Sequence, residues 1–336
     1  MMPKACRHAL RAGVCALLAL PLAGCFEQPL SILDPAGPGA APITQVWWVM
    51  FWGSLAIYLL VLGLATYALL HRRRNGQAPR RALLIGGGLA LPIVVVFLLL
   101  AYGIRSGQAM LPLPTSQTVF RVDVRGHQWW WEVSYPDAPG GALYSANEIH
   151  IPAGVPVDVH VSTEDVIHGF WVPRLGGKID AIPGRTNVIR LRADAPGEYH
   201  GVCAEYCGVQ HARMALVVYA HPAEDMPARL AALAGAGVDD PADLQDTQGA
   251  RDFTQHCLAC HAMNPRERSS QPGPNLADLG VRAMLGAGTL ENTPEALRDW
   301  LRHHQARKPG NRMPQAGLPD AGFDAIADFL EHSSTP

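Results

Sequence analysis

The chain has 336 residues, and its 27 Lys and Arg against 29 Asp and Glu give a formal net charge of -2. This balance excludes the strongly basic class of proteins that bind nucleic acid, and an anionic membrane surface is not an expected main partner. The length leaves room for two or three domains. No Asp or Glu occurs between Ala36 and Val122, and this interval contains two long apolar runs. We therefore expect it to lie mostly in a membrane.

The N-terminus has the pattern of a bacterial export signal over residues 1–24. Three basic residues precede an apolar core that is too short to cross a bilayer, which needs about 20 residues. The segment ends in Leu-Ala-Gly-Cys, a tetrad that resembles the lipobox of bacterial lipoproteins. We expect cleavage before Cys25, lipid on Cys25 and an exported N-terminal segment over residues 25–42. An ordinary cleaved signal with an incidental cysteine is the alternative.

Two runs, residues 43–70 and 82–104, are long and apolar enough to span a bilayer as helices. The loop between them, residues 71–81, contains five arginines and no acidic residue. The positive-inside rule places this loop in the cytoplasm, so both ends of the hairpin lie outside, as the export signal requires. The sequence thus predicts a bacterial inner-membrane protein with two spanning helices and its other domains on the periplasmic face.

After residue 113 the pattern changes to short segments typical of β-strands. In TVFRVDVRG and VPVDVHVST, β-branched residues alternate or nearly alternate with polar ones, and Gly and Pro separate the segments. We predict an all-β sandwich or barrel over residues 115–221, then a linker over residues 222–246 that begins with a short helix. From residue 247 the apolar spacing is helical, so residues 247–336 are expected to form a small all-α domain.

Four cysteines of the exported region form two close pairs, and an exported compartment permits two disulfides as one interpretation. The second pair, Cys257 and Cys260, is directly followed by His261. Cys-x-x-Cys-His is the attachment motif of a c-type haem, in which both thiols bond to the haem and the histidine can reach the iron. We therefore predict a covalent haem c at this motif.

A second axial ligand is needed on the opposite face of this haem. Met263 is too close in sequence to His261, and Met284 is possible. Met313 precedes the last helix at a suitable distance and is the preferred candidate, because His–Met ligation raises the haem potential and suits electron transfer. The segment GPNL, residues 273–276, can orient His261 through a backbone carbonyl.

The first pair lies in a dense group of soft donors. Cys203, Cys207, His211 and Met214 offer two thiolates, an imidazole and a thioether, a set that favours copper over magnesium or calcium. Zinc is a rival, although a thioether is unusual at zinc. Two thiolates can bridge two copper ions, which then need a second imidazole, and His168 is the best candidate. The competing histidines are His127, His150, His160 and His200.

Four long motifs carry a resemblance to a known family. They are GHQWWW at 126–131, VIHGFWVP at 166–173, KIDAIPG at 178–184 and CAEYCGVQHARM at 203–214. With the hairpin and the haem motif, the chain resembles subunit II of the haem–copper cytochrome c oxidases, in the form with a cytochrome c domain fused at its C-terminus. The resemblance implies a multidomain membrane protein: a two-helix transmembrane hairpin, an all-β cupredoxin-like sandwich and an all-α class I cytochrome c domain.

The resemblance also implies a binuclear, mixed-valence copper centre of the type called CuA. In this sequence Cys203 and Cys207 would bridge the two coppers, and His168 and His211 would each bind one of them.

Further site residues follow from the same resemblance. Met214 and the backbone carbonyl of Glu205 would be weak axial ligands of the coppers. The Glu205 side chain would bind magnesium at the contact with subunit I, and Trp129 would be the aromatic residue at which electrons enter.

The resemblance implies that electrons from cytochrome c pass through CuA to subunit I, which reduces O2 to water and pumps protons. The cytochrome c could be the fused haem domain, a separate exported donor or both. Expected partners are subunits I and III, that donor and membrane lipid, with no nucleic acid. The alternative is a membrane-anchored copper and haem electron carrier that acts without an oxidase core.

Overall fold

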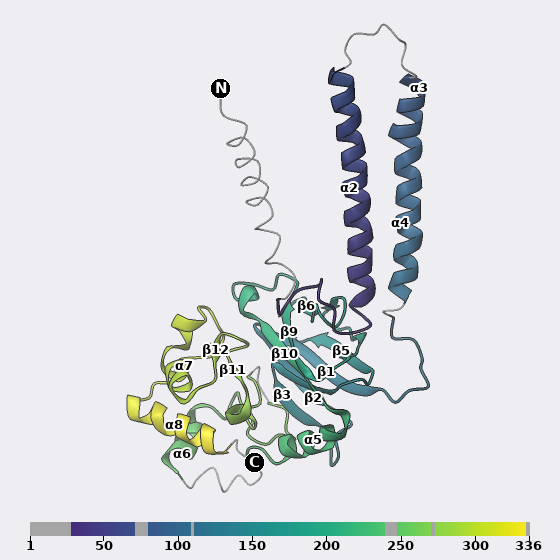
Figure 1. Cartoon of the computed structure of the whole chain (residues 1–336). Coiled ribbons are helices and arrows are strands. Elements are labelled where there is room, and N and C mark those ends of the chain that lie inside the picture. Colours follow the sequence, from purple (N-terminus) through teal and green to yellow (C-terminus); the bar gives the residue numbers. More distant parts are fainter. Residues whose placement is uncertain (1–27, 71–79, 109–110, 239–246, 270–272, 334–336) are drawn as a thin grey trace, which may run out of the picture.

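The computed structural model describes residues 28–70, 80–108, 111–238, 247–269 and 273–333 (Figure 1). The predicted signal at 1–24, the lipid site at Cys25 and most of the arginine-rich loop at 71–81 lie outside the described residues.

Two long apolar helices stand side by side, away from the compact part of the chain (Figure 1). The first is α2 (Ala41–Leu70), and the second runs through α3 (Arg80–Ala82), the π-helical segment η2 (Leu83–Ala90) and α4 (Leu91–Gln108). Their mean hydropathies over the most apolar windows are 2.0 and 2.8, and those windows are not covered by protein. Each helix is longer than the roughly 20 residues that a bilayer requires, so the pair is long and apolar enough to anchor the chain in a membrane.

Ten strands form two five-stranded sheets that pack as a sandwich. One sheet has the order β3-β2-β1-β5-β8 and the other β4-β10-β9-β6-β7. The strands are β1 (Phe120–His127), β2 (Trp130–Tyr135), β3 (Leu143–Ala146), β4 (Glu148–Pro152), β5 (Val157–Thr163), β6 (His168–Trp171), β7 (Ile179–Ala181), β8 (Asn187–Leu191), β9 (Gly197–Cys203) and β10 (Ala215–His221).

The alternation seen in the sequence sets the register of the central strands. β1 and β5 pair in parallel, with Val122 opposite Val159 and Val124 opposite Val161. All four valines are buried, because side chains at every second position of a strand point to the same face. This face forms the core of the cupredoxin-like domain.

The first part of the segment after β10 packs against the two neighbouring domains. Helix α5 (Met226–Ala234) buries Met226, Leu230 and Leu233 in the core of the β-sandwich. Val238 then packs against the core of the C-terminal domain, and its N–H donates to the carbonyl of Met263 (3.0 Å). Of the predicted linker at 222–246, the first part therefore belongs to the two domains that it connects.

The C-terminal domain is built from α6 (Gln248–His256), α7 (Pro294–Arg307) and α8 (Asp320–Ser333), as the helical spacing predicts. Thr247 and Thr293 cap the first two helices, each accepting a backbone N–H three residues later (both 3.1 Å). The only strands among the described residues of this domain are the two-residue β11 (Met284–Leu285) and β12 (Leu290–Glu291).

Candidate metal centres

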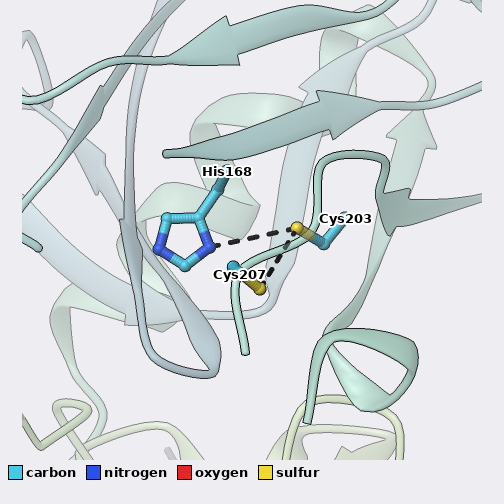
Figure 2. Close-up of side chains that lie close together, drawn as sticks. All are labelled: His168, Cys203 and Cys207. Carbon is cyan, nitrogen blue, oxygen red and sulfur yellow. Dashed lines mark hydrogen bonds between the residues drawn. The ribbon is translucent and has the colours of Figure 1, made fainter. Parts of the chain in front are cut away.

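Two strand ends and one loop bring three metal-binding side chains together. His168 is the first residue of β6, Cys203 is the last residue of β9, and Phe170 pairs opposite Cys203. This pairing places His168 beside a cysteine 35 residues away in sequence. The loop after Cys203 then brings Cys207 to the same point (Figure 2). One ligand atom from each of His168, Cys203 and Cys207 lies within 4.8 Å of the others.

The two sulfurs are placed for a shared metal and not for a disulfide. The Sγ atoms of Cys203 and Cys207 are 3.7 Å apart, and both thiols are free and buried. A disulfide would need about 2.05 Å. Thiolates lie about 2.3 Å from a bound zinc ion, so two sulfurs at this spacing can both reach an ion of similar size.

The remaining predicted copper ligands surround the same pair. His211 Nδ1 and Met214 Sδ lie 3.7 and 3.9 Å from Cys207 Sγ. The carbonyl oxygen of Glu205 lies 3.3 Å from Cys203 Sγ. The structure therefore gathers the other four predicted donors around the sulfur pair. It gives no ligand contact for the Glu205 carboxylate, so magnesium at that side chain stays a prediction.

Asp165 fixes the orientation of His168. Its Oδ1 lies 2.9 Å from His168 Nε2, which leaves Nδ1 facing Cys203 Sγ at 3.9 Å. Burial alone would raise the pKa of Asp165, but His168 and two backbone N–H donors lower it to about 2. The carboxylate therefore stays ionised. Asp165 was not among the predicted site residues, although its position three residues before His168 is a signal that the sequence contains.

The contact between the two thiols shifts their pKa values in opposite directions. A hydrogen bond from Cys207 lowers the pKa of Cys203 to about 3, while burial opposes this change. The same contact raises the pKa of Cys207 above its ordinary range. Without a cation the pair therefore favours one shared negative charge over two. Bound metal ions supply the positive charge that a dithiolate needs.

Trp129 packs directly on the ligand loop. Its indole Nε1 donates to the carbonyl of Cys207 (3.0 Å), and the Gln128 side chain donates to the same oxygen (2.7 Å). Gly208 has φ +119°, and a Cβ there would lie 2.9 Å from the Trp129 ring. Only glycine allows this close approach, so the indole is in contact with the loop that holds the sulfur pair.

The Cys-x-x-Cys-His motif begins at Cys257, the C-cap of α6, which is absent from the described lining of the cavity that the rest of the motif faces. His261 Nδ1 lies 2.7 Å from the carbonyl oxygen of Pro274, which confirms the predicted orienting contact and leaves Nε2 available to iron. Cys260, His261 and Met313 line one cavity together, and Met284 also lines it.

Two neighbours of the motif support this arrangement. A Cβ on Gly273 would lie 2.4 Å from the carbonyl oxygen of Cys260 and 3.0 Å from the His261 ring, so only glycine fits there. Met263 is buried in the domain core and is absent from the described lining of the cavity.

The four histidines that compete with His168 as copper ligands lie outside the group of metal-binding candidates around the two sulfurs. His150 Nδ1 lies 2.9 Å from His221 Nε2, and the Arg229 guanidinium donates to His150 Nε2 (2.8 Å). His127 stacks on the Trp130 ring with centroids 4.4 Å apart. His160 is on β5 and His200 on β9, outside the three-residue group around the sulfurs.

Known proteins share both domains and most of the chain. Residues 140–221 match the family described as cytochrome C oxidase subunit II, periplasmic domain, and residues 247–334 match the cytochrome c family. The chain is 32% identical to cytochrome c oxidase subunit 2 of Alkalihalophilus pseudofirmus, over 93% of this chain and 94% of that protein. The chain belongs to the cytochrome c oxidase subunit 2 family.

A second relative and one solved structure are also similar to this chain. The subunit of Bacillus sp. strain PS3 is 30% identical over 94% of both proteins. The crystal structure of the periplasmic domain of subunit II of cytochrome oxidase from Bradyrhizobium japonicum is 29% identical. The match covers 36% of this chain and 95% of that domain, with a TM-score of 0.33.

Family membership confirms the resemblance seen in the four sequence motifs, and with it the role of an oxidase subunit. It also implies a copper site in the cupredoxin-like domain and haem in the cytochrome c domain. The residues fit both groups. The sulfur pair is free and surrounded by nitrogen and sulfur donors, and a histidine nitrogen is left available beside a cavity lined by a methionine.

Proposed function

We propose that this chain is the subunit at which electrons enter a terminal oxidase of the bacterial inner membrane. Electrons from cytochrome c, through the fused haem domain, an external donor or both, pass to a binuclear CuA centre and then to subunit I. Subunit I reduces O2 to water and pumps protons. The observation that carries the proposal is the unbridged sulfur pair with His168 beside it.

When bound, the two coppers and the haem supply one-electron redox chemistry. The protein supplies ligands that are already in place. Asp165 holds His168 in one orientation, and the loop carrying Cys207 is fixed by hydrogen bonds from Gln128 and Trp129. Prearranged ligands reorganise little when the charge of the site changes, which favours a relay over a site that binds substrate.

The finer assignments rest on the family resemblance together with these contacts. Cys203 and Cys207 would hold the two coppers together, and His168 and His211 would supply the two imidazole ligands. Met214 and the Glu205 carbonyl would be the weaker ligands. We propose Trp129 as the aromatic residue at which electrons enter, because its indole contacts the Cys207 carbonyl.

Membrane attachment and assembly belong to the same proposal. The two helices anchor the chain, and Cys25 adds lipid. The partners are subunits I and III, with magnesium at Glu205 where the chain meets subunit I.

Electron paramagnetic resonance with metal analysis of the full chain tests this function. We expect two coppers per chain that share one unpaired spin, and one covalent low-spin haem. A chain that is oxidised at Cys203 and Cys207, and that takes up no copper under reducing conditions, would contradict the proposal.

Met214→Leu tests the axial thioether. Met214 is fully buried and its sulfur lies 3.9 Å from Cys207 Sγ. Leucine has a similar volume, so the stability cost should stay below about 1.5 kcal/mol. We expect the copper potential or spectrum to shift while the copper content and assembly are retained. An unchanged spectrum and potential would exclude Met214 as a ligand.

A further inference from the structure

Lys308 is a buried cation that joins two domains. It lies at the end of α7 and is 3% exposed. Its Nζ donates to the carbonyl oxygens of Trp129 (2.9 Å), Arg213 (2.7 Å) and Gly286 (2.7 Å). An ammonium group has three protons, so all its donors are used. Among the described residues no carboxylate forms an ion pair with it, so these carbonyls are the direct partners of the buried charge.

Two of the three carbonyls belong to the copper-binding domain. Trp129 contacts the ligand loop, and Arg213 directly precedes the predicted ligand Met214. Gly286 belongs to the cytochrome c domain, like Lys308 itself. The ammonium therefore links the backbone on both sides of the copper loop to the haem domain. Burial lowers the pKa of Lys308 to about 7, and three carbonyl acceptors favour its ammonium form.

The surface around Lys308 is buried between the domains. Trp130 and Ala146 of the β-sandwich form one buried apolar cluster with Ala287 of the cytochrome c domain. The buried Glu148 carboxylate accepts the N–H groups of Ala283 (2.7 Å) and Met284 (3.2 Å) across the same contact. Buried polar groups with complete partners are typical of a fixed interface and not of a transient encounter.

The haem cavity opens onto this interface. Trp129 and Trp130 line the same cavity as His261 and Met313. The face of the β-sandwich that carries Trp129 is thus already occupied by the chain's own cytochrome c domain.

We propose that Lys308 is a positioning residue that locks the cytochrome c domain onto the Trp129 face, so that the fused haem is the fixed donor to the copper centre. This inference rests on the proposed function, since it assumes that both cofactors are present. An external donor then reduces the haem domain at another surface and does not reach Trp129.

Lys308→Met in the full chain, loaded with copper and haem, tests the lock. Methionine matches the four-atom unbranched stem of lysine up to Cε and removes the ammonium with all three donors. After rapid photoreduction of the haem, one electron passes from ferrous haem to the oxidised copper pair, with no proton or bond transferred. We expect the rate of this step to fall about tenfold or more in the variant, because three buried acceptors lose their partner. Copper and haem spectra should stay unchanged.

Hydrogen exchange gives a second readout that does not depend on electron transfer. The amide protons of Ala283 and Met284 are bonded to Glu148 across the interface, so their exchange should speed up in Lys308→Met. The matched control is Arg302→Met on the same helix. Arg302 pairs with Asp320 and Asp324 inside the cytochrome c domain, so its loss should leave both readouts at their wild-type values.

The wild-type chain provides an independent test of the fixed arrangement. A locked domain transfers its electron at a rate that does not change with solvent viscosity, whereas a tethered domain that must dock slows as viscosity rises. Wild-type rates that fall with viscosity would overturn the proposal. If the Lys308→Met protein does not retain copper or haem, the same measurements are made on Lys308→Gln, whose side chain keeps two of the three donors.

Two failures can be told apart. Wild-type electron transfer and exchange in the lysine variant, with both cofactors bound, would refute the role of Lys308 alone. A wild-type chain without the shared-spin copper signal would instead refute the proposed function.

Discussion

Serine at position 207 should abolish the binuclear copper centre. Cys207 Sγ is the common neighbour of Cys203 Sγ (3.7 Å), His211 Nδ1 (3.7 Å) and Met214 Sδ (3.9 Å). Removing this sulfur therefore removes one bridging ligand, and it also removes the atom that both His211 and Met214 contact. Loss of groups that only orient ligands typically lowers metal affinity 10- to 100-fold. Loss of this bridging ligand should therefore lower the copper affinity by more than about 100-fold.

Cys207→Ser is nearly isosteric, so the β-sandwich should fold as in the wild type. Copper content and the electron paramagnetic resonance spectrum measure the effect, and oxidase activity with reduced cytochrome c should fall with them. Tyr206→Phe is the control in the same loop, because Tyr206 is highly exposed and loses only its hydroxyl. A Cys207→Ser chain that kept two coppers with a shared spin would show that this sulfur does not bridge.

The sequence predicted those parts of the site that depend on short spacing. The two cysteine pairs, His211 and Met214 lie within two compact motifs. The structure keeps the donors of the first motif together. His168 was harder to place, because its position depends on the pairing of β6 with β9. The need for a second imidazole made His168 the best candidate among five histidines, and the family resemblance then implied the same residue.

The domain interface could not be predicted from the sequence. Lys308 and Trp129 are 179 residues apart, and their contact joins a side chain to a backbone carbonyl. Such a contact leaves no periodicity or motif, since any residue supplies a carbonyl. A lone lysine after a helix is more simply interpreted as a favourable charge at the helix C-terminus. The linker was expected to begin with a short helix, but the packing of α5 on the β-sandwich core could not be predicted, because its partners lie on strands distant in sequence.

Met313→Leu should lower the haem potential by on the order of 100 mV, within the roughly 0.8 V that axial ligands span, because a His–Met pair raises the potential. With 59 mV for each tenfold change in a one-electron equilibrium, the haem would accept electrons from its donor about 50-fold less favourably. Met313 lines the cavity with His261, where it could serve as the second axial ligand, and its N–H donates to Asn311 Oδ1 (3.0 Å).

Met284→Leu and Met263→Leu are the matched controls for this substitution, because each exchanges the same two side chains in the same domain. Met284 lines the cavity, but its strand β11 is tied through its N–H to Glu148 of the β-sandwich. Met263 lies in the domain core. Redox titration followed by haem absorbance should show the wild-type potential in both controls and a lowered potential only in Met313→Leu. A lowered potential in Met284→Leu instead would move the axial ligand to β11, at the interface itself, and the haem would then contact the copper-binding domain through its own ligand strand.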